Sequence, residues 1–83
     1  MIEQIKANDV TERVAEVFRK TFGKKAVFGL ELKRTDLAQW TSMKHVEFII
    51  GLEMAFGVRF DGADATDMIS IPVVIERVRR RLQ

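Results

Sequence analysis

The chain contains no cysteine, and only one histidine, one proline and one tryptophan. Without cysteine it can form neither a disulfide nor a thiolate metal site, and a single histidine leaves little for a zinc site. No stretch approaches the roughly 20 apolar residues of a membrane span, and the start lacks a basic segment followed by a long apolar one. We therefore expect no metal, no membrane span, a cytoplasmic location and a fold that depends on packing alone.

The composition that is present is that of a folded domain, with 47% hydrophobic and 31% charged residues among 83. A chain of this length, with no repeat and no linker, predicts a single domain over residues 1–83. Such a domain has too little interior for both a core and a deep enzyme pocket. These observations favour a carrier, adaptor or binding module over an enzyme, and we expect a monomer.

The charges are unevenly distributed along the chain. Residues 1–40 carry eight basic and six acidic side chains, residues 41–76 carry two and six, and residues 77–83 carry four and none. The four C-terminal cations are Arg77, Arg79, Arg80 and Arg81. We interpret them as complementing the negative end of a helix dipole. The alternative, a basic domain that binds nucleic acid or another anionic surface, predicts phosphate binding that falls steeply as salt rises.

Hydrophobic periodicity predicts an all-α fold with three principal helices, a short third helix and a long loop between helices 1 and 2. The first helix is expected to begin near Asn8 or Asp9, where Asp9 and Glu12 resemble a capping box, and to end at Gly23 as a left-handed cap. In the loop at residues 23–41, apolar side chains should anchor the chain to the bundle. These are Phe28, Leu30, Leu32, Leu37 and Trp40.

The second helix is expected to run from about Ser42 to Phe56, followed by a short helix capped by Asp61 and a last helix capped by Ser70. Gly51 should let another element approach the second helix closely. The residues expected on the buried faces are Val10, Val14, Val17, Phe18 and Phe22, then Val46, Ile49, Ile50, Leu52 and Phe56, then Ile71, Val74, Ile75, Val78 and Leu82. A second possibility is that Val46, Ile50, Met54 and Ile71 line a cavity between helices, but core packing explains them without one.

Ser42 is the main candidate functional residue because it lies where the irregular stretch gives way to an amphipathic helix. A phosphate attached to its hydroxyl would face free backbone N–H groups and the positive end of the helix dipole. Ser42 could instead be a simple helix-starting residue. A hydrolytic pair with His45, three residues later, is disfavoured because no third orienting group or oxyanion site is evident. Trp40 is interpreted as a loop anchor, with shielding of an attached group as the alternative.

The order of elements and the motif around Ser42 resemble the acyl carrier proteins and related phosphopantetheine-binding carrier domains. Members of that family have Asp-Ser-Leu at the start of the second helix, followed by Val-Glu and a run of aliphatics. The corresponding stretch here is Thr41-Ser42-Met43-Lys44-His45-Val46-Glu47-Phe48-Ile49-Ile50-Gly51-Leu52-Glu53-Met54-Ala55-Phe56. Gly57-Val58-Arg59-Phe60-Asp61 and Ile69-Ser70-Ile71 are similar to the family's entries into the third and fourth helices.

The resemblance implies an acyl-carrier-like four-helix bundle that is not itself an enzyme. A phosphopantetheinyl transferase would attach 4′-phosphopantetheine from coenzyme A to Ser42, and the thiol of the arm would carry an acyl or aminoacyl group as a thioester. The resemblance also implies acyl-loading and acyl-transferring partner enzymes, in fatty acid, polyketide or specialised lipid biosynthesis, and no nucleic acid. Partner recognition would fall to Thr41, Met43, Lys44, Glu47 and Glu53.

The chain departs from the family pattern beside the serine. Thr41 replaces the usual Asp, which lies near the metal and coenzyme A during modification, although threonine can still cap the helix. Met43 replaces Leu with a side chain of similar volume, and Lys44 makes the helix entrance less negative. Thr41 therefore leaves open an alternative: a carrier-like domain that is never modified and acts as a protein-interaction module.

Overall fold

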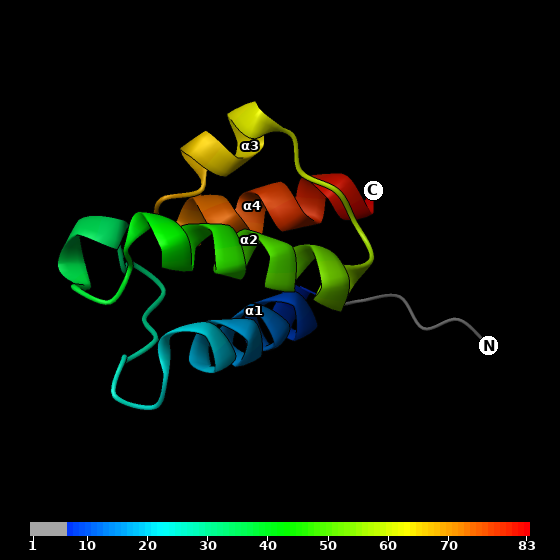
Figure 1. Ribbon diagram of the computed structural model, residues 1–83. Helices are drawn as coiled ribbons and strands as arrows, with labels where there is room; N and C mark the ends of the chain where they lie inside the picture. Colours follow the sequence, from blue (N-terminus) through cyan, green and yellow to red (C-terminus); the bar gives the residue numbers. More distant parts are fainter. Residues whose placement is uncertain (1–6) are drawn as a thin grey trace.

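The computed structural model describes residues 7–83 and is all-helical over that range (Figure 1). Its elements are α1 (Ala7–Phe22), a single 3₁₀ turn η1 (Arg34–Asp36), α2 (Ser42–Phe56), α3 (Gly62–Asp67) and α4 (Ile71–Leu82). The described residues form no strand, and their only sheet-like pairing is an isolated bridge between Lys33 and Ser70. The predicted all-α fold, with three principal helices, a short third helix and a long loop after the first, is confirmed.

Local capping residues set most of the helix boundaries. Thr41, Asp61 and Ser70 are the N-caps of α2, α3 and α4, and each side chain accepts a hydrogen bond from the backbone N–H three residues later. Gly23 and Gly57, which follow α1 and α2, have φ values of 90° and 65°. Only glycine adopts this left-handed conformation without a steric cost, so it ends both helices.

Helix α1 begins at Ala7, close to the predicted start near Asn8 or Asp9, but the predicted cap is wrong. Asp9 lies inside the first turn of α1 and so is not its N-cap. Its carboxylate still lies at the end of the helix where the dipole favours negative charge.

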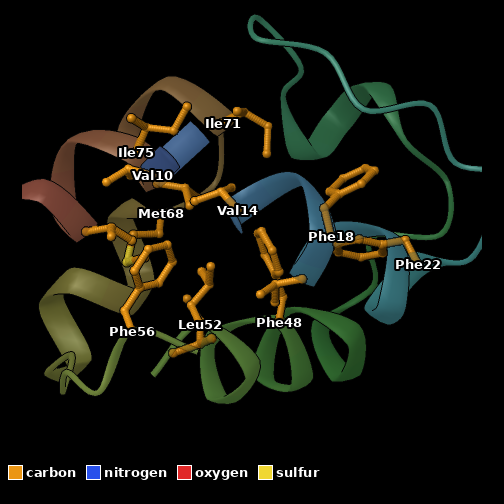
Figure 2. Close-up of a cluster of buried hydrophobic side chains, with 14 of the residues drawn as sticks. Val10, Val14, Phe18, Phe22, Phe48, Leu52, Phe56, Met68, Ile71 and Ile75 are labelled. Carbon is orange, nitrogen blue, oxygen red and sulfur yellow. The ribbon is translucent and has the colours of Figure 1, made fainter. Parts of the chain in front are cut away.

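Helices α1, α2 and α4 surround one core of buried side chains (Figure 2). Phe18 and Phe48 are fully buried at the centre of its aromatic half, with Phe22 and Trp40 beside them. Gly51 faces α1 so closely that a Cβ built on it would lie 3.0 Å from Cγ1 of Val17. The expected close approach at Gly51 is therefore confirmed.

The orientation of α2 corrects the predicted core. Val46 and Ile50 are 57% and 49% exposed, whereas Phe48, which was not assigned to the buried face, is fully buried. The cavity considered for Val46, Ile50, Met54 and Ile71 is also wrong, because only Ile71 among them is buried. The physical reason is that α2 is apolar around most of its circumference, so packing against α1 selects its buried face.

Two further side chains assigned to the interior lie at the surface. Leu30 is 58% exposed and does not anchor the loop, because the chain turns outward there between Gly29 and Leu32. Leu82 is 36% exposed at the end of α4. The other loop anchors are in place: Trp40 is buried, and Phe28, Leu32 and Leu37 pack against the core.

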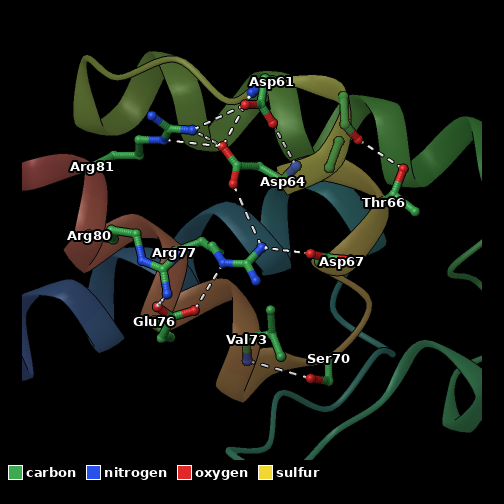
Figure 3. A network of polar contacts seen from close by, with 12 residues as sticks. Asp61, Asp64, Thr66, Asp67, Ser70, Val73, Glu76, Arg77, Arg80 and Arg81 are labelled. Carbon is green, nitrogen blue, oxygen red and sulfur yellow. Dashed lines mark hydrogen bonds and ion pairs between the residues drawn. The ribbon is translucent and has the colours of Figure 1, made fainter.

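A network of carboxylates and arginines joins α3 to α4 (Figure 3). Asp64 is buried and accepts hydrogen bonds from Arg81, and it also lies 3.7 Å from Nη1 of Arg77. The bond from Arg81 holds the pKa of the Asp64 carboxyl below its usual value, against the opposing effect of burial. Arg80 pairs with Glu76 one turn earlier. These contacts give the C-terminal arginines a structural role.

No helix in the described part of the chain has both the length and the apolar character needed to cross a membrane.

Candidate functional site

Ser42 is the first residue of α2 and its side chain is exposed. Thr41 takes the capping position, since its Oγ1 accepts a hydrogen bond from the N–H of Lys44 at 3.2 Å. The prediction that Thr41 can cap the helix is confirmed. Because Thr41 is the cap, the Ser42 hydroxyl is not needed for the helix boundary and is available at the end of the bundle.

The Ser42 hydroxyl has one neighbour that the sequence did not predict. Nη2 of Arg34 donates a hydrogen bond to Ser42 Oγ at 3.0 Å, and Nε of the same side chain donates to the carbonyl oxygen of Trp40 at 3.1 Å. Arg34 reaches Ser42 across eight positions of sequence, from η1. The guanidinium therefore bridges the loop and the first turn of α2.

Backbone hydrogen bonds to the segment between α3 and α4 hold η1 in place. The N–H of Arg34 donates to the carbonyl oxygen of Ile69 at 2.8 Å, and the N–H of Ile71 donates to the carbonyl oxygen of Leu32 at 2.9 Å. These bonds join segments that lie far apart in the sequence. They fix the backbone from which Arg34 extends toward Ser42.

His45 belongs to the first turns of α2, and its ring connects this helix with the loop before it and with α3. Trp40 Nε1 donates to His45 Nδ1 at 2.9 Å, and His45 Nε2 lies 2.7 Å from the carbonyl oxygen of Ala65 in α3. Since the indole N–H is only a donor, Nδ1 is the acceptor and Nε2 carries the proton that Ala65 accepts. Both ring nitrogens are thus engaged, and neither contacts Ser42. The arrangement supports a loop-packing role for His45 and gives no support to a Ser-His hydrolytic pair.

An open groove lies beside Ser42, with a volume of about 540 Å³. Its lining consists of Lys33, Arg34, Thr35, Trp40, Ile69 and Ser70. The groove falls within the volume range of small-molecule sites, but it is open to solvent and its lining holds no carboxylate or histidine. It offers a surface along which an extended group can lie.

A stripe of exposed apolar side chains runs along α2 from the serine. Its members are Met43, Val46, Ile50 and Met54, which are 80%, 57%, 49% and 80% exposed. The spacing of three, four and four residues places them on one face of the helix. We call this surface the α2 stripe. Contiguous exposed apolar surface of this kind is typical of a binding site.

The predicted recognition residues divide into two groups. Met43 belongs to the α2 stripe, and Lys44 and Glu47 lie beside it, paired with each other at 3.6 Å. Glu53 is different, because it is half-buried and its Oε2 accepts a hydrogen bond from the N–H of Phe60 at 2.8 Å. Eleven positions of helix separate Glu53 from Ser42, or roughly 16 Å at 1.5 Å per residue. Thus Met43, Lys44 and Glu47 lie next to the serine, and Glu53 does not.

Sequence reasoning missed Arg34 and the exposure of the α2 stripe. Among residues 7–83 there is no group of three or more histidine, aspartate or glutamate side chains that could hold a metal ion.

Comparison of the chain with models of protein families finds no match. No curated protein matches the sequence, and no solved structure matches the fold.

Proposed function

We propose that this protein is an acyl or aminoacyl carrier, not itself an enzyme, that holds its cargo as a thioester on a 4′-phosphopantetheine arm attached to Ser42. The observation that carries the proposal is the position of Ser42: an exposed hydroxyl in the first turn of α2, from which the α2 stripe continues. A hydroxyl placed there is accessible to a modifying enzyme. The sequence resemblance around Ser42 supplies the chemistry.

Attachment is a phosphoryl transfer in which the atoms balance. Ser42 Oγ forms a bond to the phosphorus that carries pantetheine in coenzyme A, and the pyrophosphate bond breaks. Adenosine 3′,5′-bisphosphate leaves, and the hydroxyl proton passes to a base of the transferase. The carrier contributes the oxygen and its orientation, and the thiol that later holds the cargo belongs to the arm.

The α2 stripe supports the proposal because a carrier must be recognised by several enzymes in turn. Met43 and Val46 are exposed within one turn of Ser42, and Lys44 and Glu47 supply charges beside them. An enzyme that binds this surface brings its active site to the serine. We propose the α2 stripe as the surface shared by the transferase and by the acyl-loading and acyl-transferring enzymes.

The test is the intact mass of the protein after incubation with coenzyme A, magnesium and a broad-specificity phosphopantetheinyl transferase. We expect a gain of one phosphopantetheinyl group that Ser42→Ala abolishes. The chain has one other serine, Ser70, which caps α4, so Ser70→Ala is a matched control that should keep the gain. Absence of a gain in the unaltered protein, even with a transferase from its own source, would refute the carrier function.

The α2 stripe also favours a second candidate, an unmodified interaction module that binds a partner through α2 alone. This function needs no group on Ser42. It predicts no mass gain, and it predicts that Ser42→Ala leaves partner binding intact whereas Met54→Glu, far from the serine, weakens it. In the carrier proposal, loss of Ser42 removes cargo transfer whatever happens to binding.

A further inference from the structure

The guanidinium of Arg34 is half-buried, and its two hydrogen-bond partners are both neutral. It donates to the Ser42 hydroxyl and to the carbonyl oxygen of Trp40. No carboxylate within residues 7–83 forms an ion pair with it, in contrast to Arg77, Arg80 and Arg81 on α4. The nearest acidic residue in sequence, Asp36, accepts a hydrogen bond from the N–H of Lys33 at 3.0 Å. The positive charge of Arg34, which no carboxylate pairs with in residues 7–83, therefore faces the Ser42 hydroxyl.

We propose that Arg34 is a positioning residue that binds the phosphate attached to Ser42, both while the phosphate is transferred and in the modified protein. This inference rests on the proposed carrier function and deepens it. Nη2 lies 3.0 Å from Ser42 Oγ, and the non-bridging oxygens of a phosphate on Oγ lie within a further bond or two of that oxygen. The same N–H can therefore donate to a phosphate oxygen after a small rotation.

Charge favours this exchange of partners. A guanidinium bonded to a phosphate pairs two opposite charges and can donate two parallel hydrogen bonds, so it is held more strongly than the same guanidinium bonded to a neutral hydroxyl. Thr41 is neutral, so no carboxylate immediately before Ser42 competes for the guanidinium. Carriers of the family that the chain resembles have Asp immediately before the serine. This chain has the neutral Thr41 there, and the cation of Arg34, held by η1 and the Trp40 carbonyl, lies beside the serine instead.

The first test compares rates of modification by the same transferase with coenzyme A. Arg34→Gln should lower kcat/KM by roughly tenfold to a hundredfold, the range expected for losing a charged hydrogen bond. The loss should include kcat, because the contact is to the reacting phosphate. Arg34→Lys should restore part of the rate, since it keeps the charge but not the planar fork. Lys24→Gln removes one exposed positive charge from the same loop, outside the groove, and should stay within about threefold of the unaltered protein.

A second measurement needs no variant. In the unaltered protein, the Nη2–H signal of Arg34 and the ³¹P signal of the attached phosphate should show that the two groups are in contact, by a shift of the Nη2–H signal on modification and by its sensitivity to ³¹P decoupling. This readout decides the question if Arg34→Gln disturbs the loop, which circular dichroism would reveal. If Arg34 only supports the loop through the carbonyl oxygen of Trp40, its Nη2–H signal should show no coupling to the phosphate after modification.

The outcomes separate the inference from the carrier function. If the unaltered protein is never modified, both are wrong. If it is modified, but Arg34→Gln reacts as fast as Lys24→Gln or the Arg34 signal is unchanged on modification, the carrier function stands and the role of Arg34 is refuted. A slow Arg34→Gln with partial rescue by lysine, together with the shifted signal, would establish Arg34 as the phosphate-binding residue.

Discussion

Phe48 and Ile50 lie two positions apart on α2 but have opposite surroundings. Phe48 is fully buried, with its ring centroid 5.4 Å from Phe22, 5.6 Å from Trp40 and 6.1 Å from Phe18. Truncating a buried phenylalanine to alanine costs about 3–5 kcal/mol. Three aromatic partners, each contributing about 0.5–1.5 kcal/mol beyond buried area, place Phe48→Ala in the upper half of that range. We expect a loss of about 4 kcal/mol in the free energy of unfolding.

That loss is large for this chain. At about 0.05–0.15 kcal/mol per residue, a protein of this size has roughly 4–12 kcal/mol of stability, so Phe48→Ala should lose about a third of it or more. Phe48→Leu should lose less and remain measurable. Ile50→Ala removes a half-exposed side chain from the same helix and should cost less than about 1 kcal/mol.

Urea denaturation followed by circular dichroism at 222 nm measures all three variants. If Ile50→Ala costs as much as Phe48→Leu, or if Phe48→Ala costs less than about 1 kcal/mol, then α2 buries a different face. The α2 stripe would then be part of the core and not a binding surface.

Three further predictions concern stability. Because the bond from Arg81 lowers the pKa of Asp64 in the folded state below its ordinary value of 3.8, stabilisation by Asp64 should be complete above that value and lost as the pH falls below it. Asp64→Asn should flatten this acid limb in urea melts recorded between pH 2 and 6, and an unchanged limb would contradict the assignment. Gly57→Ala should cost about 1 kcal/mol because φ at Gly57 is 65°, and a neutral effect on the urea midpoint would argue against the left-handed cap. Trp40→Phe removes the donor to His45 Nδ1 and should cost about 1–3 kcal/mol, with a shift of the His45 Nδ1 signal in ¹⁵N spectra, while the bond from Nε2 to the Ala65 carbonyl keeps the tautomer. An unchanged Nδ1 signal and an unchanged stability would refute the role of that bond.

Most helix boundaries were predictable because they depend on local chemistry. Asp61 and Ser70 were recognised as N-caps from their side chains and positions, and Gly23 as a left-handed cap from its lack of a Cβ. The bounds of α2 also agree with the prediction, from Ser42 to Phe56. Each of these signals acts within one turn of helix, so no knowledge of the rest of the fold is needed.

The buried face of α2 could not be predicted in the same way. Apolar side chains occur around most of the helix, so the period of 3.6 residues does not single out one face. The close approach of Val17 to Gly51 fixes the rotation, and that contact comes from α1. Val46 and Ile50 are consequently turned outward, which only the packed structure reveals.

The contact between Arg34 and Ser42 could not be predicted from the sequence for a related reason. Arg34 belongs to an irregular loop whose path depends on backbone bonds to Ile69 and from Ile71. Those partners lie more than thirty positions further along the chain, and nothing local to Arg34 indicates them. The motif singled out Ser42 as a candidate, whereas nothing in the sequence pointed to Arg34, the cation that contacts it.

Trp40 provides a built-in optical reporter of this end of the molecule. It is the only tryptophan of the chain, it is 3% exposed, and its indole N–H is bonded to His45, three residues after Ser42. Its fluorescence therefore comes from a single site next to Ser42, with no second emitter to dilute it. Movement of the loop away from α2 would shift the emission to longer wavelength while the helices remained intact. Comparison of emission with far-ultraviolet dichroism thus separates local opening at the serine from unfolding of the whole bundle.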